Sequence, residues 1–203
     1  MERTAAVMRM IGGLLAYATL GFVFFGIWRG TQRQPGRTSG IFGSWLRSSW
    51  FYLLSSALFF GLSYWGWTPL PLSLTPLVRV WMLALGCLFY FPGILLVLWG
   101  RLALRENYFV STGMGAQLFA GHELVTGGPF AIIRHPMYSG LILAALGSFL
   151  LYTTWTSLFY ALFSPFIILR AYREEMTLAA EFGEQWQEYS NRVPAFVPRL
   201  KRK

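Results

Sequence analysis

The chain has 203 residues, of which 55% are hydrophobic, 18% aromatic and only 12% charged. Soluble domains carry about 25% charged residues, so this composition excludes an ordinary water-soluble globule. The 17 Lys and Arg residues exceed the eight acidic residues by nine and cluster between long neutral stretches, which favours membrane lipids over nucleic acid as partners. The single Cys87 excludes an intrachain disulfide and a Cys-based zinc site.

The first three uncharged stretches have the length of membrane spans, which need about 20 mostly apolar residues. We expect these spans over residues 10–28, 49–67 and 80–100. The first lacks a small-residue cleavage site and is expected to be retained in the mature protein. In the third, Pro92 predicts a kink, because proline lacks the N–H of a helical hydrogen bond.

The fourth stretch, residues 136–169, contains 34 uncharged residues and would reach roughly 51 Å as a single helix. That length is too great for one crossing and slightly short for two. We therefore expect a compact hairpin that turns near residues 152–155. Its second leg is expected to continue past Arg170 as an amphipathic helix through Tyr189.

Lys and Arg residues in short loops mark the cytoplasmic side of a membrane protein. Four Arg residues flank the first loop, whereas the second loop and the hairpin tip are uncharged. The sequence thus predicts an all-α, multi-pass integral membrane protein with about five membrane-inserted helices. Its N-terminus is expected outside, and its C-terminus and polar loops in the cytoplasm.

Ionisable groups suited to chemistry are confined to the second half of the chain. Between Arg3 and Arg105 there is no acidic residue and no His, whereas both His and seven of the eight acidic residues follow. This asymmetry predicts a membrane scaffold over residues 1–100 and a cofactor-binding catalytic part over residues 101–203. The alternative is that cytoplasmic segments are simply where charge is tolerated.

The first motif with specific chemistry is Arg134-His135-Pro136. Proline suits the first turn of a helix, whose free N–H groups and dipole attract anions, and Arg134 and His135 add positive or donor groups there. The motif predicts a site for a carboxylate or phosphate of a cofactor. The alternative is an interfacial anchor that binds lipid phosphate.

The second motif contains Arg170, Glu174 and Glu175. Arg170 and Glu174 are four residues apart and fit an ordinary helical ion pair. Two adjacent carboxylates at the membrane edge, however, are costly without a compensating cation, which favours a functional role. No metal site is expected, because His122 and His135 lack a third ligand at zinc spacing.

Taken together, the motifs of the second half resemble the isoprenylcysteine carboxyl methyltransferase family and its phospholipid methyltransferase relatives. The resemblance covers about residues 101–200. It rests on the order and spacing of these residues: His122, Leu124, Val125, Gly128, Arg134, His135, Pro136, Tyr138, Gly140, Arg170, Glu174, Glu175, Phe182, Gly183, Trp186 and Tyr189. Phe130 and Trp186 depart from the family pattern, in which Tyr is common at both places.

The resemblance implies an integral membrane enzyme that transfers a methyl group from S-adenosyl-L-methionine. It implies that Arg170 and Glu174 lie at the methyl-transfer point. The residues that it implies for cofactor binding are His122, Leu124, Val125, Gly128, Arg134, His135, Tyr138, Glu174 and Glu175.

The predicted acceptor is lipophilic, with an isoprenylcysteine-like carboxylate or a thiol as the leading expectation. A phospholipid amine and a small thiol are the alternatives within the same enzyme class. Sterol reductases of related fold are disfavoured by the short chain. A non-enzymatic scaffold, whose basic tail at Arg199–Lys203 binds anionic lipid, is the alternative of another class.

Overall fold

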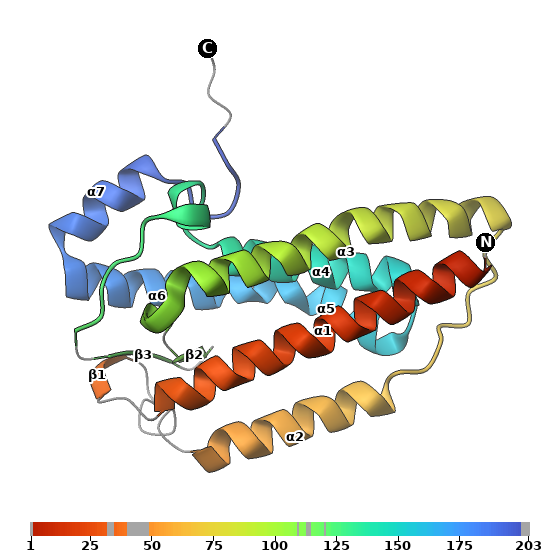
Figure 1. Ribbon diagram of the computed structural model, residues 1–203, viewed down its shortest axis with the longest axis horizontal. Coiled ribbons are helices and arrows are strands. Elements are labelled where there is room, and N and C mark those ends of the chain that lie inside the picture. The colour runs from red at the N-terminus through yellow and green to blue at the C-terminus, as the bar shows by residue number, and fades with distance from the viewer. Residues whose placement is uncertain are drawn as a thin grey trace.

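The computed structural model describes residues 2–31, 35–39, 49–108, 110–112, 115–119 and 121–199. The described chain is mostly helical (Figure 1). Its α-helices are α1 (Glu2–Thr31), α2 (Ser49–Trp65), α3 (Pro76–Leu104), α4 (Pro136–Tyr152), α5 (Trp155–Phe163), α6 (Ile167–Phe182) and α7 (Glu184–Arg192). Short 3-10 turns are η2 (Arg105–Asn107), η3 (Gly128–Ala131) and η4 (Ser164–Phe166).

Two of the helices are long and apolar enough to cross a membrane. They run over Glu2–Arg29 and Pro76–Asn107 and contain the first and third predicted spans. The shorter apolar helices are Leu53–Trp65, within the second predicted span, and Pro136–Tyr152. Helix α3 continues as one element through Pro92, which forms part of its interior.

The core of the described structure lies between α3 and α4, whose backbones are in direct contact. A Cβ atom built on Gly93 would lie 2.5 Å from the Ala144 nitrogen, and one on Gly147 would lie 2.3 Å from the Tyr90 nitrogen. Side chains larger than hydrogen do not fit there. On the α4 side, this contact is formed by the small residues Gly140, Ala144 and Gly147.

The hairpin between α4 and α5 turns at the predicted place. Thr153 adopts a left-handed conformation with φ of 50°, and Thr154 caps α5 by accepting a hydrogen bond from the Ser157 N–H at 3.2 Å. The second leg continues past Arg170 as expected, through the η4 turn into α6. The predicted helix does not reach Tyr189 unbroken, because Gly183, with φ of 50°, separates α6 from α7.

A small antiparallel sheet adds strands that the all-α prediction omits. Its order is β1 (Pro35–Ser39), β3 (Gly115–Phe119), β2 (Val110–Thr112). Pro35 is opposite Phe119, and Val110 is opposite Gln117. The sheet therefore ties the first loop to the polar loop after α3.

Candidate functional site

The start of α4 is covered by the C-terminal segment Val193–Phe196, called here the 193–196 segment. The N–H of Arg134 donates to the Pro194 carbonyl at 2.8 Å, and the N–H of His135 donates to the Ala195 carbonyl at 2.9 Å. The Ser139 hydroxyl donates to the Phe196 carbonyl at 3.0 Å. Pro136 occupies the first turn, as expected, and the backbone N–H groups of the two residues before it are bound by carbonyls of the 193–196 segment.

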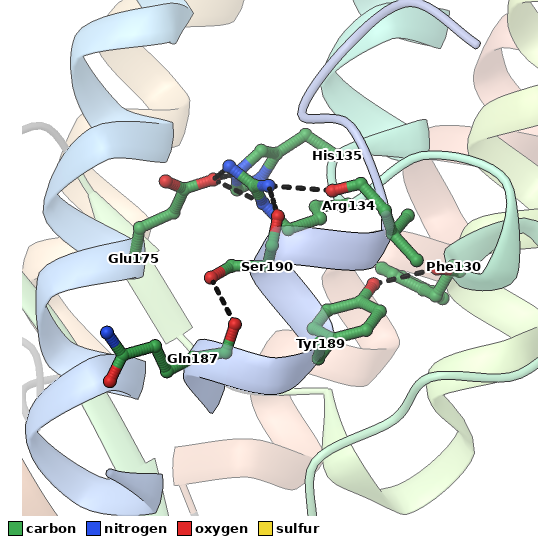
Figure 2. A network of polar contacts seen from close by, with 8 residues as sticks. Phe130, Arg134, His135, Glu175, Gln187, Tyr189 and Ser190 are labelled. Carbon is green, nitrogen blue, oxygen red and sulfur yellow. Dashed lines mark hydrogen bonds and ion pairs between the residues drawn. The ribbon is translucent and has the colours of Figure 1, made fainter. Parts of the chain in front are cut away.

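Glu175 binds both residues that precede α4 (Figure 2). Its Oε1 accepts from Arg134 Nε at 2.9 Å and lies 2.8 Å from His135 Nε2. Burial alone would raise the pKa of Glu175, but hydrogen bonds from His135 and Arg134 outweigh it and hold the pKa below its ordinary value. Glu175 is therefore a carboxylate at neutral pH.

The guanidinium of Arg134 also holds the C-terminal part of the chain. Its Nη1 donates to the Ser190 carbonyl at 2.8 Å and to the Val193 carbonyl at 2.7 Å. Together with Glu175, which binds Nε and Nη2, these bonds occupy all three nitrogens of the guanidinium. The Trp186 ring centroid lies 5.9 Å from the guanidinium carbon. This geometry points to a role of Arg134 in positioning the end of α7.

Tyr189 fixes α7 from the other side, as Figure 2 also shows. Its hydroxyl donates to the Phe130 carbonyl at 2.7 Å. Burial raises the pKa of Tyr189 to about 12, so the hydroxyl stays protonated. Trp186, Tyr189 and Val193 form a buried apolar cluster against Leu124. Helix α7 is thereby packed over the polar loop.

Glu174 makes a separate set of contacts with Tyr138 and Arg170. It accepts a hydrogen bond from the Tyr138 hydroxyl and lies 3.6 Å from Arg170 Nε. The Arg170 guanidinium lies over the Tyr138 ring at 5.3 Å. Successive residues of an α-helix point about 100° apart, so Glu174 and Glu175 reach different neighbours. The predicted pair of Arg170 and Glu174 is confirmed as a contact.

A cavity of about 410 Å³ joins these groups. This volume is in the range of small-molecule sites. Eight predicted site residues contribute to its lining: His122, Leu124, Val125, Arg134, His135, Tyr138, Arg170 and Glu174. Gly128 and Glu175 lie outside the lining. A Cβ atom on Gly128, whose φ is +61°, would meet Ala103 of α3 at 3.5 Å, so this residue serves the loop conformation.

The two histidines differ in their surroundings. His135 is 6% exposed and stacks between Tyr138 and Phe196, with ring centroids 5.6 and 5.1 Å away. His122 packs beside Phe182 at 6.0 Å, and burial lowers its pKa to about 4. His122 is therefore neutral at pH 7 and offers the cavity a hydrogen-bonding group without charge.

The sequence prediction missed part of the cavity wall. Helix α1 contributes Thr19, Leu20, Val23 and Ile27, and Tyr108 follows α3. The spacing of Thr19, Val23 and Ile27 places them on one helical face, but any apolar helix offers such a face. Nothing in their residue type distinguishes a cavity wall from a packing surface.

The sequence profile of the phospholipid methyltransferase family matches residues 81–185. A methanethiol S-methyltransferase 2 of Bradyrhizobium diazoefficiens is 32% identical over 73% of this chain. A protein-S-isoprenylcysteine O-methyltransferase of Schizosaccharomyces pombe is 37% identical over 38% of it. The chain spans 59% and 34% of the lengths of these relatives, respectively.

The solved structure of a eukaryotic intramembrane Ras methyltransferase, the isoprenylcysteine carboxyl methyltransferase, resembles the chain in fold. The TM-score is 0.50 with 24% sequence identity, over 74% of this chain and 53% of that one.

Proposed function

The chain belongs to the phospholipid methyltransferase family, and on that premise we propose that it is a membrane enzyme that methylates a lipophilic acceptor with S-adenosyl-L-methionine. The family match confirms the resemblance drawn from the motifs. The observation that carries the proposal is the Tyr138–Glu174–Arg170 group, which opens on the cavity together with both histidines. The similar proteins named above are methyltransferases of a thiol and of isoprenylcysteine.

The cavity fits the chemical groups of this cofactor. Glu174 provides a negative charge for a sulfonium, and its side chain is only 11% exposed, so water screens that charge weakly. Leu124 and Val125 provide apolar surface for a purine ring. His122 and Tyr138 provide hydrogen-bonding groups. These residues would hold the cofactor, which supplies an activated methyl group when bound.

His135 and Arg134 also line the cavity, but both are held by Glu175. We predict that Glu175 acts indirectly, by fixing the His135 ring at the cavity wall. Gly128 would contribute through the conformation of the loop that carries Val125.

The chain's own part in the reaction is alignment and exclusion of water. Arg170 lies beside Glu174 and would orient an anionic acceptor for in-line transfer. A carboxylate or thiolate acceptor needs no base, so the pair would act by position and charge. An amine acceptor must first lose a proton, and Glu174 would then serve as the base.

We favour an isoprenylcysteine-like carboxylate or a thiol, because the wall that α1 contributes is apolar and Arg170 supplies a cation for an anionic acceptor group. A phospholipid amine is the second candidate within the same class. The corresponding partners are membrane lipids and a lipophilic or lipidated substrate.

The proposed membrane arrangement follows from the sequence and from the apolar helices. Five inserted segments would comprise α1, α2, α3, α4 and the leg from α5 to Arg170, with the rest of α6 and α7 lying along the surface. The N-terminus would be outside, and the site and C-terminus in the cytoplasm. Residues 1–100 would supply most of the scaffold, and residues 101–203 the cofactor-binding part.

Calorimetry of the purified full-length protein with S-adenosylhomocysteine tests the function. We expect saturable heat, together with transfer of a labelled methyl group to components of a lipid extract. Glu174→Gln should reduce the transfer, and Glu188→Gln, on the exposed side of α7, should not. A membrane scaffold without enzymatic activity would give neither heat nor labelled product.

A further inference from the structure

Helix α1 lies outside the region matched by the family profile, yet it is fixed firmly to the site. Near its N-terminus, the Tyr90 hydroxyl donates to the Gly12 carbonyl and the Tyr152 hydroxyl donates to the Arg9 carbonyl, both at 2.8 Å. Near its other end, Gly26 lies against Arg101, whose Nη2 would be 2.3 Å from a Cβ atom at that position. The two contacts are about 21 Å apart along the helix.

Arg101 connects α1 to Tyr108, a residue of the cavity lining. It is only 8% exposed, and its guanidinium lies over the rings of Phe22 at 5.0 Å and Tyr108 at 4.3 Å. Tyr108 and Leu104 line the cavity directly. The position of α1 relative to the cavity is thus set by a buried cation held between two aromatic rings.

Residues 19–27 of α1 form one wall of the cavity. The opposite side of the same helix segment faces away from the cavity. Leu20, Val23 and Ile27 face the cavity, whereas Leu14 and Phe25 are 65% and 52% exposed. In a membrane, the exposed side of such a helix faces the lipid chains.

The cavity side of α1 is also chemically inert. Thr19 is buried there, but its hydroxyl donates to the Leu15 carbonyl of its own helix at 2.7 Å. The wall therefore offers apolar surface, whereas Glu174, Arg170 and the histidines contribute their ionisable groups from other elements. A ligand with a polar end and a hydrocarbon end would place its polar end at Glu174 and Arg170 and its hydrocarbon end against α1.

We propose that this face of α1 is the acceptor wall: the hydrocarbon part of the methyl acceptor lies along it, and Val23 and Ile27 set the bulk that the site admits. The inference rests on the proposed function and assigns acceptor choice to a helix that carries none of the family's motifs. The acceptor class is an anionic or thiol head group on an aliphatic chain.

The test uses the full-length protein and two series of acceptors, N-acetyl-S-alkylcysteines and 1-alkanethiols, with linear chains from methyl to hexadecyl. Val23→Phe reduces the space in the cavity next to the acceptor wall, and Val23→Ala increases that space. Leu14→Phe adds the same ring to the lipid-facing side of the helix and is the matched control. Acceptor affinity is measured by calorimetry with S-adenosylhomocysteine bound, and KM by transfer of a labelled methyl group.

We expect Val23→Phe to raise the KM and the dissociation constant of the longer acceptors by about tenfold relative to the methyl compound. Val23→Ala should shift the preference toward longer chains, and Leu14→Phe should match the wild type. All three variants should bind S-adenosylhomocysteine as the wild type does, which shows that each is folded.

Two outcomes overturn the inference, and they are distinguishable. If the wild type binds and methylates acceptors but both Val23 variants keep its chain-length profile, the proposed wall is wrong and the enzyme function stands. If the wild type neither binds S-adenosylhomocysteine nor methylates any acceptor, the proposed function is wrong, and the acceptor wall with it.

Discussion

Glu174 and Glu175 are consecutive residues, but the two sides of α6 on which they lie differ in exposure to the cavity and in bonding. On the Glu174 side, the carboxylate accepts from Tyr138, lies beside Arg170 and lines the cavity. On the Glu175 side, the carboxylate lies outside the lining and is bound by Arg134 and His135.

The difference shows how adjacent like charges are tolerated near a membrane surface. Each carboxylate has its own cationic neighbour, so neither is left uncompensated. Glu175 binds Arg134, which in turn donates to the carbonyls of Ser190 and Val193 at the end of α7. The Glu174 side leaves a charged group at the cavity, where a ligand can meet it. We therefore propose a stabilising role for Glu175 and a functional role for Glu174.

The largest effect is expected from the substitution Glu174→Gln. It removes the charge at the cavity and keeps the side chain's size, so we expect turnover to fall by about 100-fold or more with little loss of stability. Steady-state transfer of a labelled methyl group measures the effect. A changed pH profile of the residual activity would indicate an amine acceptor, and an unchanged profile an anionic one. Equal turnover in variant and wild type would contradict the assigned role.

Replacement of Glu175 should instead act on stability. Glu175→Ala leaves the partly buried Arg134 and the buried His135 without their carboxylate, and we expect the free energy of unfolding to fall by about 2 kcal/mol. The midpoint of thermal unfolding in detergent reports it. Glu188→Ala, on the exposed side of α7, is the control and should leave the midpoint unchanged. If both variants melt alike, Glu175 does not stabilise the site.

The stabilising effect of Glu175 should depend on pH. Its pKa in the folded protein lies below the ordinary value of 4.5, so its contribution is fully present above that value and is lost as the pH falls through the lowered pKa. The difference in midpoint between wild type and Glu175→Gln should therefore shrink in acid. Unfolding measured from pH 7 downward checks this, and a difference that grows on acidification would reverse the assignment.

The smallest effect is expected at Tyr189, which holds α7 from the side away from Glu175. Tyr189→Phe keeps the buried ring and removes the hydrogen bond to the Phe130 carbonyl, so we expect the free energy of unfolding to fall by about 1 kcal/mol. Methyl transfer should be unchanged apart from this loss. A drop in turnover at a temperature where the variant is fully folded would instead place the hydroxyl in the reaction.

The sequence was informative where local chemistry decides the structure. Uncharged stretches predicted α1 and α3, and the length of the uncharged stretch 136–169 predicted the hairpin turn. The order of motifs predicted that Tyr138, Glu174 and the histidines would meet at one site, and the cavity brings them together. Helical spacing also indicated the contact between Arg170 and Glu174.

Features that depend on pairing between distant segments could not be predicted from the sequence. The strands β1 and β3 are far apart along the chain and pair through backbone groups, which carry no residue signature. The same holds for the 193–196 segment, which bonds to Arg134 and His135 through its carbonyls. The break at Gly183 is not evident from the sequence, because the helical spacing of Phe182, Trp186 and Tyr189 continues across it.

The 193–196 segment has a consequence for biogenesis. A ribosome synthesises α1 through α7 before it reaches Val193, so the helices can enter the bilayer while Arg134 still lacks two of its carbonyl acceptors. Closure over the start of α4 is thus a late event in maturation. A chain that ends before Pro194 would contain all the described helices but lack the carbonyls that bind the N–H groups of Arg134 and His135.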